Sequence, residues 1–522
     1  MASELKKVKL EVKFDGANWT DVTADVRANT PITGAYGIFG HGPLDRMASA
    51  GTMSFALDDS EKNSASLLGY YSPEHANART GFELNVQVRL TLVFGTYYDV
   101  ELYDTFTYGA DWVKFVGKVT EIRPEAGVKG PRVTQCQAQD FVYEMSQHLM
   151  DRMALSTSIL SNTLFSNIVA NMPTAPVATS YSTGQETFAY GGDDLKDERS
   201  TALAAAQKVA VSEFGFAYLK GDDYTGGILT FEDRHDRVNT TAALDVSAHP
   251  PLRVKVTRSL DNIYNRVRAV AYPRVAGASP EILYSLQTNL LVAANTTEII
   301  TARYRDPTNL DVRLSGQSMV TPVVSTDYKF GSTDGEGVED KNADLTVTVS
   351  FGANAAQATL QNTSGTAGYV NLLQLRGTAL RVYDPVTVVS EDATSKTAYG
   401  LRDLSLVLPW QDNPLSAKDF GDTTLAFYKN PRQMVDEYTI SSKNVTLGNA
   451  AVRGEPGTRV TLAETVTDIS GDYFIQGVRF IVYPPDNLQV SWLCRVAAAE
   501  QAWLLGEVGF SELGTTTILG VA

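Results

Sequence analysis

The residues that could carry acid–base or metal chemistry near neutral pH are few and scattered. The chain has five histidines, at His41, His75, His148, His235 and His249. Of these, His235 lies between two acidic residues close in sequence, Asp233 and Asp236. A metal site or a general base needs further converging groups, and none is spaced for that role. We therefore predict a surface loop after a strand at His235, and we predict no catalytic residue and no metal ligand.

A glycine-rich segment, Gly34–Gly42, could offer backbone amides to an anion. Phosphate loops of that kind follow a strand and open a helix, with a Lys or Asp placed to serve the ligand. Here strand-like sequence lies on both sides of the glycines. The pattern therefore predicts an inter-strand loop and no cofactor site.

Carboxylates cluster in the acidic segment Asp334–Asp340, which holds four of them in seven residues. The glycine and glutamate spacing of a calcium-binding EF-hand is absent, so a solvated loop is predicted. Paired carboxylates for glycosidase chemistry cannot be recognised from sequence, because their separation is a tertiary quantity. No Gly-x-Ser-x-Gly, His-Glu-x-x-His or Cys-x-x-Cys motif occurs. The chain is predicted not to be an enzyme.

The two cysteines, Cys136 and Cys494, each lie in a strand-like run. Two buried free thiols are favoured, and a disulfide is left open as the alternative. The N-terminus has no apolar signal region, and no run of about 18 apolar residues occurs. We expect assembly in a cytoplasm without a membrane anchor.

Composition and charge limit the classes of function. The net charge is −16 and the pI is about 4.9, which argues against a protein that grips nucleic acid through stripes of Lys and Arg. The same charge suits a surface that DNA passes without sticking. At 522 residues the chain is too long for one ordinary core, and 24 Tyr and 40 Gly favour multidomain, mainly β structure.

The N-terminal part, residues 1–146, is predicted to be a β domain. A strand that alternates apolar and polar residues, Leu5–Phe14, precedes a hairpin-type turn at Asp15–Asn18. Further strands are predicted at Gly51–Asp59, Asn85–Phe94, Val113–Ile122 and Arg132–Ala138. Several short strands separated by turns indicate a sandwich or barrel.

Residues 147–250 are predicted to form an α+β domain. Apolar spacing predicts a helix from about residue 139 to 171 and a second from 193 to 214. A hairpin follows, with strands at Gly215–Leu219 and Gly227–Arg234.

Strands return in residues 251–385, at 252–256, 263–272 and in two further runs between 282 and 303. A β-sandwich insert is predicted at about 280–365, with strands at Leu345–Phe351 and Gln357–Asn362 and a longer one from Gly368. Residues 386–500 are predicted to hold one helix, Ala417–Tyr428, and three closing strands in Gly454–Ala497. A C-terminal tail, 501–522, completes the chain.

The succession of these motifs resembles the minor tail, or tail hub, proteins of long-tailed bacteriophages. It begins with Trp-Thr-Asp-Val-Thr at Trp19–Thr23, followed by the small-residue strand at 51–59 and Phe-Val-Gly-Lys-Val at 115–119. Gly-x-Leu-Thr-Phe-Glu-Asp-Arg at 227–234 comes next. The most specific match is Trp-x-Leu-Gly-x-x-Gly-x-Ser-x-Leu-Gly-x-x-Thr-x-Leu at Trp503–Leu519. The resemblance covers nearly the whole chain, although the 280–365 insert fits it poorly.

The resemblance implies two tail-tube-like β-barrel or sandwich domains, formed by residues 1–146 and 386–500, plus smaller inserted domains. It implies a structural virion protein, assembled in the host cytoplasm into the virion tail. As a homotrimer it would present six similar domains to a six-fold tube, adapt that tube to a three-fold tip, and line the DNA ejection channel. Implied partners are the tail tube, distal tail, tail tip or fibre, and tape measure proteins. DNA would pass without specific binding, and no stable membrane insertion or appended lysozyme domain is expected.

Two alternatives stay open at this stage. One is a hexameric distal tail ring protein. The other, from a different class, is a tail protein that binds glycans of the host envelope or degrades cell wall. The strands of Gly454–Ala497 are expected to act as an inter-subunit ring element.

Overall fold

A computed structural model describes residues 4–27, 30–95, 111–127, 132–150, 153–192, 200–238, 241–277, 280–306, 308–335 and 340–497. Strands dominate in this part of the chain, and six α-helices accompany them. The predicted class, mainly β with several parts, is confirmed. The predicted C-terminal tail, 501–522, lies outside the described residues.

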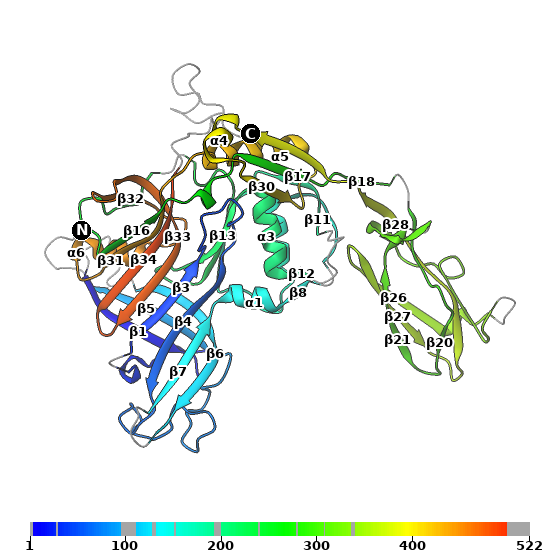
Figure 1. The fold of residues 1–522 in the computed structure, drawn as a ribbon. Coiled ribbons are helices and arrows are strands. Elements are labelled where there is room, and N and C mark those ends of the chain that lie inside the picture. Colours follow the sequence, from blue (N-terminus) through cyan, green and yellow to red (C-terminus); the bar gives the residue numbers. More distant parts are fainter. Residues whose placement is uncertain are drawn as a thin grey trace, which may run out of the picture.

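The central feature is a 13-stranded sheet that draws on both ends of the chain (Figure 1). Its order is β16-β31-β34-β33-β3-β4-β7-β6-β5-β1-β2, with β32 and β15 branching from β33. The N-terminal strands are β1 (Glu4–Val12), β2 (Thr20–Asp21), β3 (Ile32–Gly37), β4 (Ser49–Asp58), β5 (Gln87–Gly95), β6 (Trp112–Glu125) and β7 (Val133–Gln139). The others are β15 (Leu244–Asp245), β16 (Arg253–Thr257), β31 (Met434–Ser441), β32 (Arg459–Glu464), β33 (Ile469–Tyr483) and β34 (Asn487–Val496).

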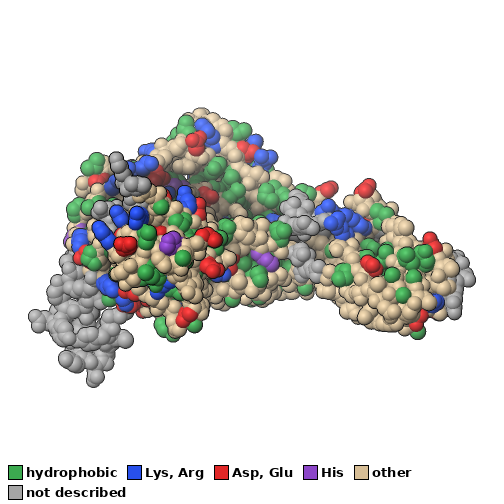
Figure 2. Space-filling model, turned by 90° about the horizontal axis from the view of Figure 1, so that it is seen from below, with side chains coloured by type: hydrophobic (Ala, Val, Ile, Leu, Met, Phe, Trp, Pro, Cys, Tyr) green, Lys and Arg blue, Asp and Glu red, His purple; other side chains and the backbone are tan. Residues whose placement is uncertain are grey.

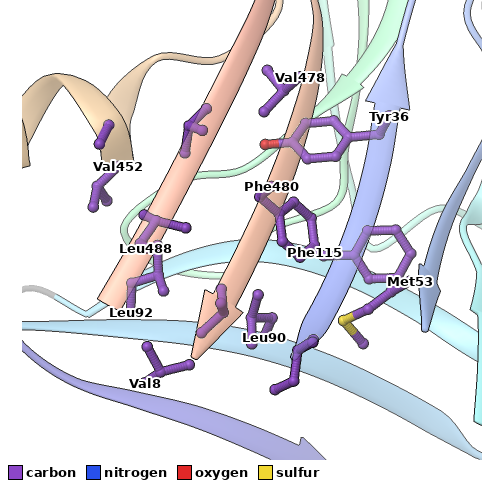
Figure 3. Close-up of a cluster of buried hydrophobic side chains, with 14 of the residues drawn as sticks. Val8, Tyr36, Met53, Leu90, Leu92, Phe115, Val452, Val478, Phe480 and Leu488 are labelled. Atoms are coloured by element: carbon purple, nitrogen blue, oxygen red, sulfur yellow. The ribbon is translucent and has the colours of Figure 1, made fainter. Parts of the chain in front are cut away.

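One hydrophobic core serves both ends of the sheet. In β1 the side chains of Val8, Leu10 and Val12 are fully buried, whereas Lys7 before them is exposed and Lys9 is half-buried, in line with the two-residue period of a strand. Figure 3 shows Val8, Leu90 and Phe115 from the N-terminal strands facing Val478, Phe480 and Leu488 from the C-terminal strands. The two β segments that were predicted to lie in separate domains therefore share one hydrophobic core.

The predicted strands of the N-terminal and closing segments are confirmed, but β3 was not predicted. The segment Gly34–Gly42 was predicted to be a loop, and its first half is instead part of this central strand. Hydrogen bonds to β4 on one side and β33 on the other hold β3 extended despite its two glycines. That tertiary pairing is not visible in the local sequence.

The middle part of the chain is an α+β unit. It contains α1 (Phe141–Gln147), β8 (Leu149–Met150), β9 (Ser156–Leu160), α2 (Ser161–Ala170), β10 (Ala178–Tyr181), β11 (Thr187–Gly191), β12 (Ser200–Thr201), α3 (Ala202–Glu213), β13 (Phe216–Lys220) and β14 (Ile228–Glu232). The predicted β13–β14 hairpin is confirmed. A single helix over 139–171 is wrong, because β8 and β9 interrupt it by pairing with β12 and β11. Of the helix predicted over 193–214, the described part begins after the N-cap Thr201.

A second, outer unit projects from the rest, at the right of Figure 1. It consists of β18 (Arg274–Ala276), β19 (Glu281–Ser285), β20 (Leu290–Val292), β21 (Thr297–Arg303), β22 (Arg305–Asp306), β23 (Asn309–Arg313), β24 (Ser315–Val320), β25 (Tyr328–Gly331), β26 (Leu345–Phe351), β27 (Ala355–Asn362) and β28 (Gly368–Val382). Two runs were predicted between 282 and 303, and three strands are observed. Two buried clusters lie between the sheets of this unit, as expected for a sandwich.

The outer unit interrupts a hairpin. Strand β17 (Arg266–Ala271) pairs antiparallel with β29 (Val386–Glu391) and parallel with β30 (Asp403–Leu408). Helix α5 (Pro414–Tyr428) packs on this small sheet and begins three residues before the predicted start, where the Asn413 side chain caps it. Helices α4 (Ala393–Tyr399) and α6 (Val445–Arg453) were not predicted. Three 3-10 helices are short: η1 (Thr23–Asp25), η2 (Leu260–Asn262) and η3 (Asn342–Asp344).

The domain limits set from the sequence stay predictions. Strand pairing nevertheless shows which segments share a sheet. Strand β18 pairs with the end of β28, so the sandwich pattern extends beyond the predicted 280–365 on both sides.

Candidate functional site

The joint between β3 and β33 is where the two ends of the chain meet. Six residue pairs form it, from Ile32 opposite Val482 to Gly37 opposite Gly477. On their other sides, β3 pairs with β4 and β33 pairs with β34. The joint therefore lies inside the sheet, and it sets the position of the N-terminal β segment relative to the C-terminal one.

Two glycines allow the strands to approach at the joint. A Cβ on Gly34 would lie 2.6 Å from Phe480 Cε1 and 2.8 Å from the backbone oxygen of Thr52. Gly37 has φ +103°, in the region that side chains disfavour, and its Cβ would lie 2.5 Å from the Gln476 oxygen. The large ring of Phe480 can cross the joint because no side chain stands at position 34.

A buried ion pair lies beside the joint. Lys114 Nζ on β6 donates to Glu455 Oε1 at 2.7 Å, and the two side chains are 0% and 4% exposed. The same ammonium donates to the carbonyl oxygens of Val452 and Gly454 at 2.9 and 3.1 Å, at the C-terminal end of α6. All three donors of the lysine are thus used, and its charge lies where a helix dipole is negative.

Glu455 also accepts hydrogen bonds from residues in three other parts of the sequence. Its Oε2 accepts from the Tyr36 hydroxyl at 2.7 Å and from the Gly221 amide at 3.0 Å, and Oε1 accepts from Trp112 Nε1 at 3.2 Å. Burial lowers the pKa of Lys114 while Glu455 opposes that change. Burial and the neighbouring carboxylate together raise the pKa of Tyr36 well above its usual value. This carboxylate binds the N-terminal strands, the α+β unit and α6 into one body.

A buried arginine attaches the α+β unit to the loop after β3. The Arg46 guanidinium donates to the carbonyl oxygens of Pro43, Phe214 and Gly215 and lies 3.4 Å from the centroid of the Phe214 ring. Backbone bonds of 2.8 Å join Ala217 to the segment on both sides of Met47. Burial, and after it the charges of nearby arginines, lower the pKa of Arg46. The backbone of the loop after β3 thus pairs with strand β13.

His41 makes a pair that its sequence neighbours did not suggest. Its Nε2 lies 3.0 Å from Asp436 Oδ1 on β31, and the Tyr428 hydroxyl donates to its carbonyl oxygen at 2.6 Å. Burial lowers the pKa of this imidazole, and Asp436 works in the opposite direction. The two residues are 395 positions apart, so no local signal could have found the pair.

The other histidines are not brought together. His235 lies in a turn after β14, as predicted, and its amide donates to Asp233 Oδ1 at 2.6 Å. His75 Nδ1 accepts from the Asn77 amide at 3.1 Å, and His148 Nε2 is buried without a partner among the described residues. His249 lies near the short strand β15. Within the described ranges, no group of three or more metal-binding side chains forms.

The glycine-rich loop already holds a carboxylate of its own chain. The Gly42 amide donates to Asp45 Oδ2 at 2.7 Å, and this carboxylate lies against the glycines at 40 and 42. An incoming anion would meet a negative charge instead of open amides. The loop after β3 instead contacts the α+β unit, through Arg46 and the backbone near Met47.

The acidic segment lies partly outside the described residues, at 336–339. Asp334 accepts from Asn289, and Asp340 accepts from the Asn342 amide at 2.8 Å.

The two cysteines are free and buried, as favoured from the sequence. Burial raises the pKa of Cys136 to about 12 and raises that of Cys494 further. Both sulfurs behave as core atoms.

Figure 2 shows acidic and basic side chains interspersed over most of one face of the molecule, with a group of Lys and Arg side chains together on the outer unit. In the part of the chain that the structure describes, helices that combine the length and apolarity needed to cross a membrane are absent.

A buried aspartate beside the joint strands has an unusual proton affinity. Asp140 caps α1 by accepting from the Val142 amide at 3.0 Å, and its carboxylate lies against Gly51 of β4. Burial raises its pKa to about 7. A carboxyl whose pKa is raised on folding stays protonated in the folded chain at pH values where the unfolded chain has lost the proton. Its contribution to stability is therefore lost as the pH rises from about 4 to about 7.

We expect Asp140→Asn to remove this pH dependence. The amide oxygen keeps the helix cap, and the variant carries no charge to desolvate. Urea unfolding of both proteins at several pH values should show the variant gaining relative stability as pH rises towards 7, by up to about 1.4 kcal/mol per unit. The exposed Asp223→Asn serves as the control. Parallel curves for wild type and Asp140→Asn would contradict the assignment.

No family model matches the chain, and no curated protein matches it. Solved structures of tail proteins align with the chain over most of their length. A tail protein from Neisseria meningitidis has a TM-score of 0.46 and 11% identity, covering 95% of this chain and 97% of that one. A 43 kDa prophage tail protein from Shewanella oneidensis has a TM-score of 0.43 and 8% identity, covering 94% and 99%. A prophage tail protein from Listeria monocytogenes has a TM-score of 0.40 and 8% identity, covering 93% and 94%. At such identities the likeness concerns the fold alone.

Proposed function

We propose that the chain is a structural subunit of a phage tail, the hub at the distal end of the tail tube. The observation that carries this proposal is the β3–β33 joint. It places two β segments from opposite ends of one chain side by side in one sheet. With this β3–β33 contact inside it, one chain would occupy two neighbouring positions of a ring of β segments.

The β3–β33 joint would let a trimer match both a six-fold tube and a three-fold tip. Three copies, each with two β segments in a fixed relation, would present six β segments to a six-fold tube and still offer a three-fold face to the tip. The contact within each chain would account for three of the six junctions. The other three would form between copies, where sheet edges meet.

The ends of the large sheet are suited to those contacts. Within the described residues, β16 pairs only with β31, and β2 pairs only with β1. Edge strands leave backbone amides and carbonyls that a neighbouring chain can cover. The strands of Gly454–Ala497 were expected to lie at an inter-subunit contact. Of these strands, β33 and β34 are paired inside the chain by β3 and β31, whereas among the described residues the outer side of β32 pairs only with the two-residue β15. We therefore propose β32, β16 and β2 for the contacts between copies.

The proposed partners are a second and third copy of the chain, the tail tube and distal tail proteins, the tape measure protein and the tip or fibre proteins. Assembly would take place in the host cytoplasm and end in the virion tail. With a net charge of −16, the inner face would repel DNA phosphates and let the genome slide through. We propose no catalytic activity.

The assembly of the purified full-length chain tests this function. We expect light scattering to give the mass of three chains, and single-particle images to show a three-fold ring whose diameter fits a tail tube. A six-fold ring would instead support the distal tail alternative. A chain that stays monomeric at high concentration, with and without tail tube protein, would contradict the hub proposal.

A further inference from the structure

A cavity lies where the outer β unit meets the α+β unit. Its volume is about 650 Å³, which falls in the range of pockets that take a small organic ligand. One wall comes from the segment at β9 and β11 and the other from β24 and the end of β26. A backbone bond of 2.9 Å from the Ala353 amide to the Met153 oxygen ties the two walls together nearby.

The described residues that line this cavity carry no charge. Its residues are Ala154, Leu155, Thr157, Ser158, Ala189, Tyr190, Gly316, Gln317, Ser318, Met319, Phe351 and Gly352. Charged residues make up 20% of the chain, so a lining of twelve without one is a distinct environment. A charged ligand would lose its hydration here without gaining a counter-charge. The cavity is therefore suited to a neutral ligand.

The polar groups of the lining are hydroxyls and one amide. Thr157, Ser158 and Ser318 are solvent-exposed residues of the lining, and Tyr190 adds a phenolic hydroxyl. Gln317 Oε1 is buried and has no hydrogen-bond partner among the described residues. A buried acceptor without a donor is costly, and a ligand hydroxyl would supply that donor. The set matches a ligand that has many hydroxyl groups.

Two serines in the lining hold an uncommon backbone conformation. Ser158 has φ +47° and Ser318 has φ +48°, one on each wall. Non-glycine residues adopt this left-handed region only when the surrounding structure imposes it, and such residues concentrate at ligand sites. Both serines here lie at the same cavity.

Aromatic rings complete the chemistry. Tyr190 lies on the α+β wall and Phe351 on the wall of the outer unit. A sugar ring offers a face of C–H groups to such rings and a rim of hydroxyls to polar groups. We propose that this cavity binds a neutral saccharide. The outer unit would then hold a host-surface glycan while the large sheet serves the tail.

Calorimetric titration of the full-length chain tests the proposal. The probes are short neutral oligomers of glucose, galactose and N-acetylglucosamine, with an oligomer of galacturonic acid as the charged comparison. We expect at least one neutral oligomer to bind and the acidic oligomer to fail, because the lining residues that the structure describes include no cation. The absence of binding by every neutral oligomer, or equal binding of the acidic one, would overturn the proposal.

Variants locate the binding. Tyr190→Ala should weaken the neutral oligomer about tenfold, whereas Tyr190→Phe, which keeps the ring, should weaken it only a few-fold. If Tyr190→Ala fails to fold by circular dichroism, Gln317→Glu provides a second variant and should abolish binding by placing a charge in the lining. Gln287→Ala, on the exposed surface of the outer unit, is the control. Unchanged binding in the cavity variants would overturn the assignment, and trimer formation would be unaffected by either result.

Discussion

Replacing Lys114 with methionine is expected to lower the free energy of unfolding by about 3–5 kcal/mol, the usual consequence of leaving a buried charge without its partner. The substitution keeps the length of the side chain but removes three hydrogen bonds, to Glu455 and to the carbonyl oxygens of Val452 and Gly454. Glu455, only 4% exposed, would then hold its charge with neutral donors alone. Urea unfolding followed by tryptophan fluorescence measures the loss.

A second ion pair supplies the matched control. Lys118 Nζ lies 2.8 Å from a Glu144 oxygen, but these side chains are 28% and 23% exposed. Water screens this pair, so Lys118→Met should cost about 0–1 kcal/mol. In the double variant Lys114→Met with Glu455→Gln, position 455 no longer carries a buried charge without its partner, and part of the stability should return. Equal costs for Lys114→Met and Lys118→Met would rule out the proposed role of the buried pair.

Substituting Gly34 by valine should open the joint between the two ends of the chain. The new Cβ would lie 2.8 Å from the backbone oxygen of Thr52, which cannot rotate away, and 2.6 Å from Phe480 Cε1. Overpacking of this kind costs about 1–3 kcal/mol in ordinary cores, and contact with a backbone atom puts this case at or above the upper end. We expect early proteolytic cleavage and loss of ring assembly, measured by limited proteolysis and light scattering.

Gly365→Val is the control for that experiment. Gly365 also lacks a side chain, but a Cβ there would have no heavy atom within 4 Å. The control should therefore resist protease and assemble as the unsubstituted chain does. A Gly34→Val protein that assembles normally would show that the β3–β33 joint does not organise the molecule.

Strands were predictable where alternation and turn residues occur together. In Gly454–Ala497 three apolar runs separated by turns gave β32, β33 and β34, because β32, much of β34 and the C-terminal part of β33 alternate buried residues with more exposed ones. The helix at 139–171 was overextended for a related reason. Apolar spacing continues beyond α1, but pairing of β8 and β9 with distant strands decides the backbone there. Local periodicity carries no information about such partners.

The joint and the buried ion pair could not have been predicted. Ile32 and Val482 meet from opposite ends of the chain, and Lys114 is separated from Glu455 by 341 positions. A lone Lys in an apolar strand is ordinarily a surface residue, so nothing marked Lys114 as buried. The predicted glycine-rich loop came nearest to the joint, since it included Gly34 and Gly37, but their role there is close packing of strands.

The chain enters and leaves the outer unit at the same end of the β17–β29 hairpin. Ala271 and Val386 are paired partners in the β17–β29 hairpin, and everything between them occupies the place of its turn. Exchange of that whole stretch by recombination would leave the register of both strands unchanged. The part that carries one wall of the proposed saccharide cavity can thus be exchanged as a unit, while the large sheet, fixed by contacts from both chain ends, keeps its pairing.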